Sequence, residues 1–281
     1  MDPTLEPFGV GNVTFDSFGW LNETAVNATL VPLCTEGETY DLRHFIIRGI
    51  CITSVVAFGV FANIMNLLIF LHRTMRNSII NWYLAALSMS DLVQLICTFF
   101  MIPLPLIAEV TGMLKLADFV TRLLVVTYPM GVTAQMNSVL FTVLVSAHRF
   151  IAVQFPFQAH RFGNKTQVKG TLIVVPLVCL LYNIFRFFEL RIFYCLSLEL
   201  NGLISNIEAT DLRANRIYFM IYHAWLYPLF MLVIPFILLI SMNTMVIISV
   251  HKSRIRHAQN SYPGVHYDTD PEAAKERRTT I

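Results

Sequence analysis

The sequence contains few charged residues. Asp, Glu, Lys and Arg together make up 14% of the 281 residues, whereas roughly 25% is usual in a soluble domain. Hydrophobic residues make up 56% of the chain. This imbalance argues against a soluble enzyme, because so little charge could not solvate the surface of a globular domain of this length.

Motifs that carry catalysis are also missing. There is no His-Glu-x-x-His zinc motif and no Gly-x-Ser-x-Gly elbow. Asp91 is the single acid within the apolar runs, whereas an intramembrane aspartyl protease needs two. The eight histidines show no metal-ligand spacing. We therefore expect no enzymatic activity, no metal and no cofactor, and the net charge of +2 implies no nucleic-acid partner.

Long runs free of charge fill most of the chain. A bilayer-spanning helix needs roughly 20 apolar residues, and each span is helical because a backbone in lipid must satisfy its own hydrogen bonds. Lys169 and Arg186 extend the short fourth run if they snorkel to the two interfaces. The sequence predicts an all-α integral membrane bundle of five transmembrane helices, within 46–250, at about 46–72, 78–107, 119–153, 168–188 and 216–250.

The few charges are distributed unevenly among the connections. The tail, residues 1–45, holds seven acids and one base, and the second and fourth connections also contain several acids. The first and third connections and residues 252–256 contain bases and no acid. Bases mark the cytoplasmic side. We expect a multi-pass protein of the plasma membrane with an extracellular N-terminus, and a flexible cytoplasmic loop over 251–281.

Sequons and cysteines fit the same orientation. Three N-glycosylation sequons begin at Asn12, Asn22 and Asn27, all within the acidic tail. Three of the five cysteines fall inside the predicted spans. Cys34 and Cys195 lie outside them and are the only plausible extracellular disulfide pair, with two unpaired thiols as the open alternative.

Polar residues inside the spans need a reason to be there, because a charge in mid-bilayer is costly. Asp91 in the second span and Asn63 in the first can form a polar network between helices, or can serve only to fix helix packing. Pro129 and Pro235 each remove a helical hydrogen bond and predict kinks in the third and fifth spans.

The third span ends in a short motif of two basic residues and one aromatic residue, His148, Arg149 and Phe150. Alone, it could be an interfacial anchor. In order and spacing, however, these features resemble the rhodopsin-like (class A) G-protein-coupled receptors. Asp91 stands where that family has its sodium-site aspartate, with Asn63 in the same network. Arg149 stands at the residue that faces the heterotrimeric G protein, and Pro235 at the proline of the fifth helix. The resemblance implies a seven-helix receptor fold.

Two further segments resemble the invertebrate FMRFamide-receptor branch of that family, 128–135 and 182–189, the second containing Asn183, Arg186 and Glu189. This resemblance implies an extracellular, short amidated neuropeptide as ligand, which acidic loops would attract if it is basic. Arg186 and Glu189 are three apart on one helical face. We expect them to pair with each other, with contact to a charged ligand as the alternative.

Three departures from the family pattern stand out. His148 replaces the acid that holds the neighbouring arginine in the family. Leu124 stands where the family has its third-helix cysteine, so Cys34 becomes the candidate partner of Cys195. No sixth or seventh apolar span precedes Ile281.

Two readings of this short chain stay open. It is either a fragment of a seven-span receptor or a truncated, non-signalling product that associates with full-length relatives, as in a receptor dimer. A transporter or channel subunit is the alternative from another class. That alternative would need an internal repeat and more polar groups at the midplane, which the sequence does not show.

Overall fold

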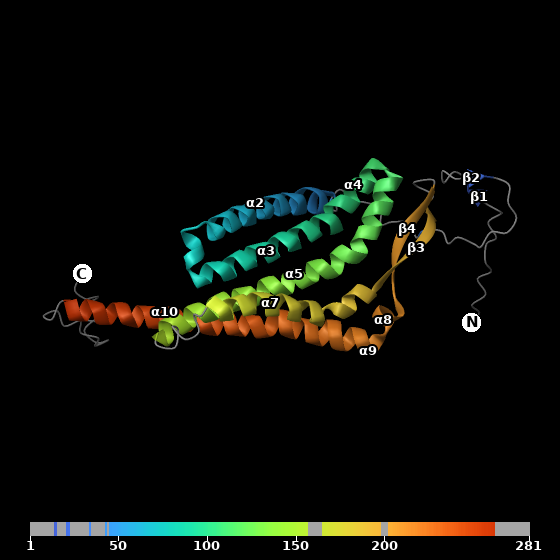
Figure 1. Cartoon of the computed structure of the whole chain (residues 1–281). Helices are drawn as coiled ribbons and strands as arrows, with labels where there is room; N and C mark the ends of the chain where they lie inside the picture. Colours follow the sequence, from blue (N-terminus) through green and yellow to red (C-terminus); the bar gives the residue numbers. More distant parts are fainter. Residues whose placement is uncertain are drawn as a thin grey trace, which may run out of the picture.

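Long helices lying side by side along one axis form the body of the protein, as the computed structural model shows (Figure 1). The structure describes residues 14–15, 21–22, 34, 43, 45–156, 165–197 and 202–261. A β-hairpin stands at one end of the bundle, which we call the hairpin end. The opposite end, where the third span finishes, is called the His148 end.

The first two spans are joined by a tight turn. A π-helical turn, η1 (Phe45–Cys51), leads into α2 (Ile52–Leu71), and the 3-10 turn η2 (Met75–Asn77) leads into α3 (Ile79–Met101). The second span then breaks, and α4 (Pro103–Thr111) starts a new helix. Proline has no N–H to donate and fits the first turn of a helix, which is why the continuous helix predicted over 78–107 is interrupted. Gly112 ends α4 in the left-handed conformation, with φ 63°.

The third and fourth spans differ in regularity. The third span is a single helix, α5 (Leu114–Gln154), which passes through Pro129 without a break. The fourth span begins as α7 (Lys165–Tyr182) and continues as the 3-10 segment η3 (Ile184–Phe188). The helix predicted over 168–188 therefore changes type at Asn183.

The fifth span starts irregularly. Its elements are α8 (Asp211–Ala214), α9 (Arg216–Tyr218), the π-helical turns η4 (Phe219–Leu226) and η5 (Leu229–Val233), and α10 (Ile234–Ser261). Wider π turns are found near Pro228 and Pro235, where the ordinary helical bond is missing.

The α10 helix runs past the predicted boundary at Val250. Residues 251–261 are helical, so the flexible loop expected over 251–281 does not begin there. The segment has no proline or glycine and several good helix formers. Residues 262–281 lie outside the described part.

The fourth connection, expected only as an extracellular loop, is a β-hairpin. Strand β3 (Leu190–Ser197) pairs with β4 (Gly202–Ala209) in antiparallel register, with Cys195 opposite Ile204. In the tail, β1 (Thr14–Phe15) pairs with β2 (Leu21–Asn22), so the sequon at Asn22 falls on a strand. The sequons at Asn12 and Asn27 lie outside the described residues.

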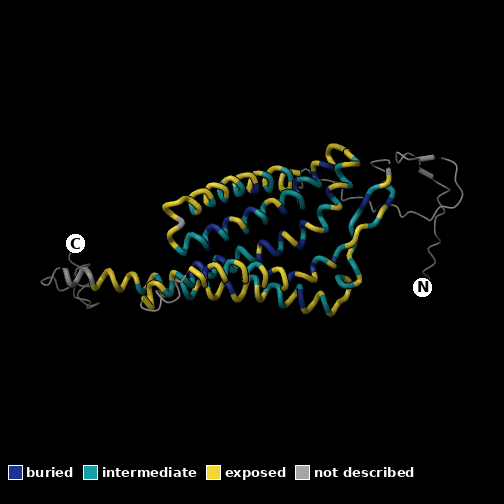
Figure 2. The backbone as a smooth tube through the Cα atoms, in the orientation of Figure 1, coloured by how far each residue is buried: buried dark blue, intermediate teal, exposed yellow. Residues whose placement is uncertain are grey.

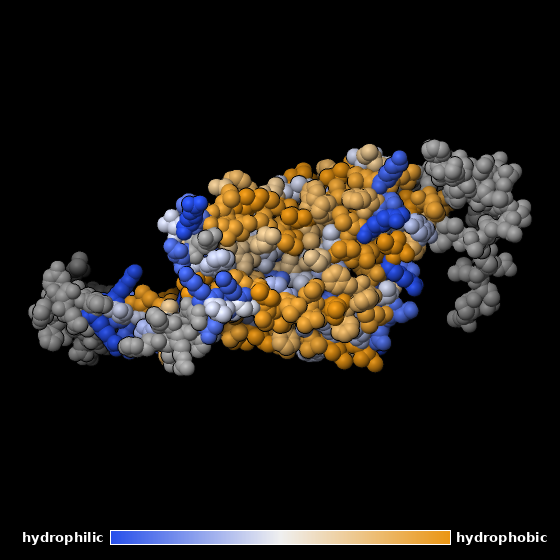
Figure 3. Space-filling model, viewed as in Figure 1, coloured by the Kyte–Doolittle hydropathy of each residue, from blue (hydrophilic) through white to orange (hydrophobic). Residues whose placement is uncertain are grey.

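Buried residues lie where the helices face one another, and much of each helix is exposed (Figure 2). Many of the exposed residues are large and hydrophobic. Hydrophilic residues gather at the two ends and a hydrophobic belt lies between them (Figure 3). Five helical stretches of the described residues are long and apolar enough to cross a membrane. The predicted all-α bundle of five transmembrane helices is thereby confirmed.

A cluster of buried side chains near the His148 end joins three spans. Phe141 and Val145 of α5 pack with Tyr83 of α3 and Val168 of α7. Toward the hairpin end, α3 and α5 approach closely at Gly131. A Cβ atom added to Gly131 would lie 3.1 Å from Cys97 Cβ. Cβ atoms cannot move without their backbones, so this contact fixes the spacing of the two helices.

A valine at position 131 should therefore push α3 and α5 apart. We expect Gly131→Val to destabilise the bundle by about 1–3 kcal/mol, the usual cost of overpacking. Thermal unfolding of the detergent-solubilised protein measures this as a lower Tm. Gly170→Val is the matched control, because a Cβ atom at Gly170 meets nothing within 4 Å. Equal Tm values for the two variants would contradict the packing argument.

Candidate functional site

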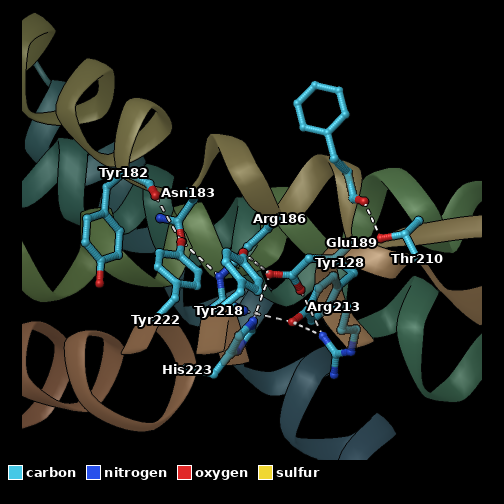
Figure 4. Close-up of polar contacts among 11 residues, drawn as sticks. Tyr128, Tyr182, Asn183, Arg186, Glu189, Thr210, Arg213, Tyr218, Tyr222 and His223 are labelled. Carbon is cyan, nitrogen blue, oxygen red and sulfur yellow. Dashed lines mark hydrogen bonds and ion pairs between the residues drawn. The ribbon is translucent and has the colours of Figure 1, made fainter. Parts of the chain in front are cut away.

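A buried polar cluster joins the third, fourth and fifth spans near the hairpin end. We call it the Glu189 cluster. Figure 4 shows most of its side chains converging on Glu189 and Arg186 from separate elements. Its members come from α5, the end of α7, η3 and the start of the fifth span, and are Tyr128, Tyr182, Asn183, Arg186, Glu189, Arg213, Tyr218, Tyr222, His223 and Tyr227.

The Glu189 carboxylate is fully buried and is surrounded by donors. Arg213 Nη1 donates to Oε2 at 2.8 Å. Tyr218 Oη donates to Oε1 at 2.7 Å, and His223 Nε2 lies 2.8 Å from the same oxygen. An ionised carboxylate only accepts hydrogen bonds, so the His223 ring N–H donates here. Three hydrogen bonds, one of which is also the ion pair with Arg213, therefore compensate the burial of this charge.

The pKa of Glu189 reflects this balance. Burial by itself would raise the pKa, because it penalises the charged carboxylate. The hydrogen bonds from Tyr218 and His223, with the positive charge of Arg186, outweigh burial and hold the pKa below its usual value. Glu189 therefore acts as a permanent anion near neutral pH.

The Arg186 guanidinium is held in an aromatic cage. Its carbon Cζ lies 4.5 Å from the Tyr227 ring centroid, 5.2 Å from that of Tyr222 and 5.9 Å from that of Tyr128. The side chain is 3% exposed. Nη1 donates to the Tyr128 hydroxyl at 2.8 Å, whereas Nη2 has no hydrogen-bond partner. Cation–π contacts with three rings thus replace much of the solvation that this charge has lost.

Asn183 links the cage to the fourth helix. This residue is fully buried. Its Nδ2 donates to the Cys179 carbonyl at 2.9 Å, and its Oδ1 accepts from Arg186 Nε at 3.1 Å. Tyr222 Oη donates to the Tyr182 carbonyl at 2.9 Å. Asn183 therefore holds Arg186 in position where α7 gives way to η3.

Two expectations for this segment were wrong. Arg186 and Glu189 do not form an ion pair with each other. Glu189 pairs with Arg213, whereas the Arg186 guanidinium contacts the tyrosine rings and donates to the Tyr128 hydroxyl. Arg186 also does not snorkel to an interface, since it is buried inside the bundle. Both corrections follow from partners on the fifth span, which sequence spacing within the fourth could not reveal.

The hairpin covers this end of the bundle and is attached by several bonds. A Cys34–Cys195 disulfide, with Cα atoms 5.0 Å apart, ties the tail to β3, so the predicted pairing is confirmed. Ser205 Oγ of β4 donates to the Asp118 carboxylate at 2.6 Å. Thr210 Oγ1 donates to the Phe188 carbonyl at 2.7 Å. These bonds fix the hairpin against α5 and the end of the fourth span.

The acids near the hairpin are largely neutralised by arginines. Besides the buried pair of Glu189 and Arg213, the structure pairs Asp118 with Arg122 and Glu208 with Arg191. The loops that were expected to attract a basic ligand by their acidity are therefore locally balanced. The excess of acids that remains at this end lies in the sequence of the tail.

Asn63 and Asp91 do not share a hydrogen bond. Asn63 Nδ2 donates to the Gly59 carbonyl of its own helix at 2.9 Å. Asp91 accepts from Ser138 Oγ on α5. The interhelical polar contact of Asp91 thus runs to the third span and not to the first, because Asn63 satisfies its amide locally. Ser138 was missed by the sequence analysis.

The residues at the end of α5 point in different directions. The His148 ring packs on Tyr83, with centroids 6.2 Å apart, and both of its buried nitrogens lack a hydrogen-bond partner. Arg149 is exposed. The Phe150 ring meets Phe155 edge-on at 6.1 Å. An exposed arginine beside an inward-facing histidine leaves Arg149 accessible from the His148 end.

The two prolines lie at buried positions. Pro129 is almost fully buried, and Thr133 Oγ1 donates to its carbonyl at 2.8 Å. Pro235 is buried at the start of α10. Neither proline contributes to the Glu189 cluster directly, but Pro129 directly follows Tyr128, which does.

Sequence reasoning missed the contributions of the fifth span. The sequence analysis treated Arg213 only as a charge of the fourth connection. It treated Tyr218, Tyr222 and His223 only as members of the apolar fifth span. The four-residue spacing of Tyr218 and Tyr222 on one helical face was the available signal. Asn215 caps the helix that carries them, accepting from the Ile217 N–H at 2.9 Å.

Removing the charge of Glu189 should destabilise the protein and flatten its acid sensitivity. A carboxylate with a depressed pKa contributes stability that is complete above its ordinary value and is lost as the pH falls through the folded pKa. We expect Glu189→Gln to cost about 1–3 kcal/mol at pH 7, because Arg213 keeps partial access to water. The fall in Tm between pH 7 and pH 3 should be shallower than in the unmodified protein.

Glu208→Gln is the matched control for this prediction. Glu208 forms an exposed ion pair with Arg191, in which the Glu208 side chain is 41% exposed and the Arg191 side chain 56% exposed. Exposed ion pairs contribute roughly 0–1 kcal/mol to stability. If both variants lowered Tm equally, the buried network could not be the source of the effect.

Comparison with known proteins points to a single family. Residues 51–281 match the family described as "Serpentine type 7TM GPCR chemoreceptor Srw". Over 236 residues the chain is 29% identical to the "Probable G-protein coupled receptor frpr-1" of Caenorhabditis elegans, which covers 77% of this chain and 61% of that protein.

The names of two further relatives include a ligand, the peptide FMRFamide. The "FMRFamide peptide receptor frpr-18" of Caenorhabditis elegans is 27% identical over 198 residues, 70% of this chain and 45% of that protein. The "FMRFamide receptor" of Drosophila melanogaster is 27% identical over 208 residues, 72% of this chain and 37% of that protein. The chain thus spans between about a third and two thirds of the length of the curated relatives it matches.

The family match covers most of the chain and agrees with its bundle of apolar helices. The expected resemblance to FMRFamide receptors is also confirmed by the two relatives that bear that name. Receptors of this class are not enzymes. The chain therefore belongs to the seven-transmembrane G-protein-coupled receptors of the serpentine chemoreceptor Srw family, as a multi-pass membrane protein that resembles the FMRFamide receptors.

Proposed function

We propose that this chain is the ligand-binding part of a plasma-membrane receptor for a short amidated peptide of the FMRFamide type. The observation that carries the proposal is the likeness to relatives that bear this ligand in their names. The hairpin end is extracellular and the His148 end cytoplasmic in this proposal. The clustered sequons and the disulfide of the tail support this orientation.

The ligand site we propose lies beside the Glu189 cluster, at Gln135 of α5. Gln135 is exposed although it lies within the span, and a polar amide at this depth is costly against lipid. Tyr227 Oη, whose ring forms part of the Arg186 cage, donates to Gln135 Oε1 at 3.4 Å. The cluster thereby holds one wall of the site in place.

A primary carboxamide at the end of a peptide suits Gln135. The side-chain amide and the peptide carboxamide each donate and accept, so two complementary hydrogen bonds can form between them. A free carboxylate at the same position only accepts, so it leaves the acceptor Gln135 Oε1 facing another acceptor with no donor between them. This difference is the basis on which the site would select an amidated ligand.

Signal transfer in this proposal ends at the His148 end, where the G protein would bind. Arg149 is exposed there, and it occupies the family position that faces the heterotrimeric G protein. Asp91 and Ser138 connect α3 to α5 between the two ends. This contact is the described polar link through which a change at the ligand site would reach Arg149.

Peptide binding tests the proposed ligand. Phe-Met-Arg-Phe-amide should bind saturably to membranes that contain the chain, and the same peptide with a free carboxylate should bind at least tenfold more weakly. Gln135→Ala should weaken binding of the amide by roughly fivefold to tenfold, the loss of about one hydrogen bond. Fluorescence polarisation of a labelled peptide measures the Kd.

Gln154→Ala is the control for this substitution. Gln154 lies at the opposite end of the same helix, where it accepts from Ser249 Oγ at 2.7 Å. The Gln154→Ala substitution should leave the Kd for the amidated peptide unchanged. Equal binding of the amide and the acid, or an equal loss in both glutamine variants, would refute the proposed site.

Glycosylation tests the proposed orientation. Treatment with peptide N-glycosidase should reduce the apparent mass of the protein made in animal cells, because Asn12, Asn22 and Asn27 are luminal during synthesis. The triple Asn→Gln variant should show no such shift. Asn164→Gln should keep the full shift, since the Asn164-Lys-Thr sequon lies on the opposite side. If only the Asn164→Gln variant lost the shift on a denaturing gel, the orientation of the chain in the membrane would be the opposite of the one proposed.

A further inference from the structure

A pocket of about 350 Å³ opens at the His148 end, between the start of the second span and the start of the fourth. It lies away from the Glu189 cluster, at the other end of the bundle. The volume falls at the small end of the roughly 300–1,000 Å³ of ligand pockets in proteins. Its lining residues are Asn77, Ile79, Trp82, Lys165, Val168 and Lys169.

Two lysines give the pocket its charge. Lys165 and Lys169 are one helical turn apart at the start of α7, and both are exposed. Like charges at this spacing repel each other. No described acid lies within ion-pairing distance of either lysine. An anion bound between them would therefore gain from both charges and relieve their repulsion.

The third connection offers no acid to fill this role. No Asp or Glu occurs between Asp118 and Glu189, a stretch that includes the whole third connection. Both of those acids lie at the hairpin end, where they are paired with arginines. Among the described residues, therefore, neither lysine has a partner anion, and an anion from another molecule can occupy the pocket.

Apart from Asn77 at the rim, the remaining lining residues of the pocket are apolar. Val168 is 3% exposed and belongs to the cluster of Tyr83, Phe141 and Val145, against which Ile79 and Trp82 also pack. Indole rings favour the depth of lipid headgroups in a bilayer. An apolar floor beside two cations matches a molecule with a phosphate and a hydrocarbon part.

We propose that this pocket binds the headgroup of an anionic phospholipid, with the phosphate between Lys165 and Lys169 and the glycerol and upper acyl chain against Ile79, Trp82 and Val168. Basic pockets between membrane helices bind such headgroups on the cytoplasmic side. The amide of Asn77, exposed at the pocket rim, can donate to a headgroup oxygen. A zwitterionic lipid lacks the net charge that the lysines require.

Native mass spectrometry of the purified full chain in detergent tests this proposal. Phosphatidylinositol 4-phosphate, phosphatidylserine and phosphatidylcholine are added separately, and bound lipids are counted. We expect the first two to bind and phosphatidylcholine to bind at least tenfold more weakly. Lys165→Gln with Lys169→Gln should weaken binding of the anionic lipids about tenfold to thirtyfold. Lys165→Arg with Lys169→Arg should retain it.

A matched variant distinguishes the pocket from general surface charge. Lys252→Gln with Arg254→Gln removes two exposed bases of α10 at the same end, and it should leave lipid binding unchanged. An equal loss in both double variants would overturn the proposal, as would equal binding of phosphatidylcholine. Circular dichroism confirms that each variant is folded.

Two further arms separate other ligands from a phospholipid. Full competition by inorganic phosphate alone would show a site for free phosphate, and binding of a sterol that is unaffected by the lysine substitutions would show a sterol site. Either result overturns the proposal. No peptide enters these assays, so their outcome is independent of whether the chain binds an amidated peptide.

Discussion

A lipid environment supplies no water to a buried charge or an open peptide group, and this constraint shapes the whole structure. Glu189 and Arg186 are the clearest cases, because both are charged and almost completely buried. Each finds its compensation within the protein, Glu189 through Arg213 and hydrogen-bond donors, Arg186 through aromatic rings. The two residues are neighbours in sequence but take partners from different directions.

These partners tie three spans together at the hairpin end. Tyr128 belongs to the third span, Asn183 to the end of the fourth, and Tyr222 to the fifth. The disulfide between Cys34 and Cys195 adds the tail to the same assembly. A ligand site beside Gln135 would therefore rest on a framework whose geometry is fixed by buried charges and a covalent bond.

The two ends of the bundle manage charge by different means. At the hairpin end, acids and arginines pair within the protein, as in Asp118 with Arg122. At the His148 end, described basic residues such as Lys165 and Lys169 stand without described acids beside them. Several acids of the hairpin end are thus paired within the protein, whereas the two lysines of the His148 end are suited to anionic partners.

The sequence alone determined the helical membrane bundle, because long apolar runs in lipid have only one way to satisfy their backbones. It also determined the family and named Cys34 and Cys195 as the candidate pair. Only the tertiary structure decided the partners of Asp91, Arg186 and Glu189. Spacing along one helix shows which residues share a face, but a buried charge selects the strongest donors or rings that reach it from any span, and packing decides which these are.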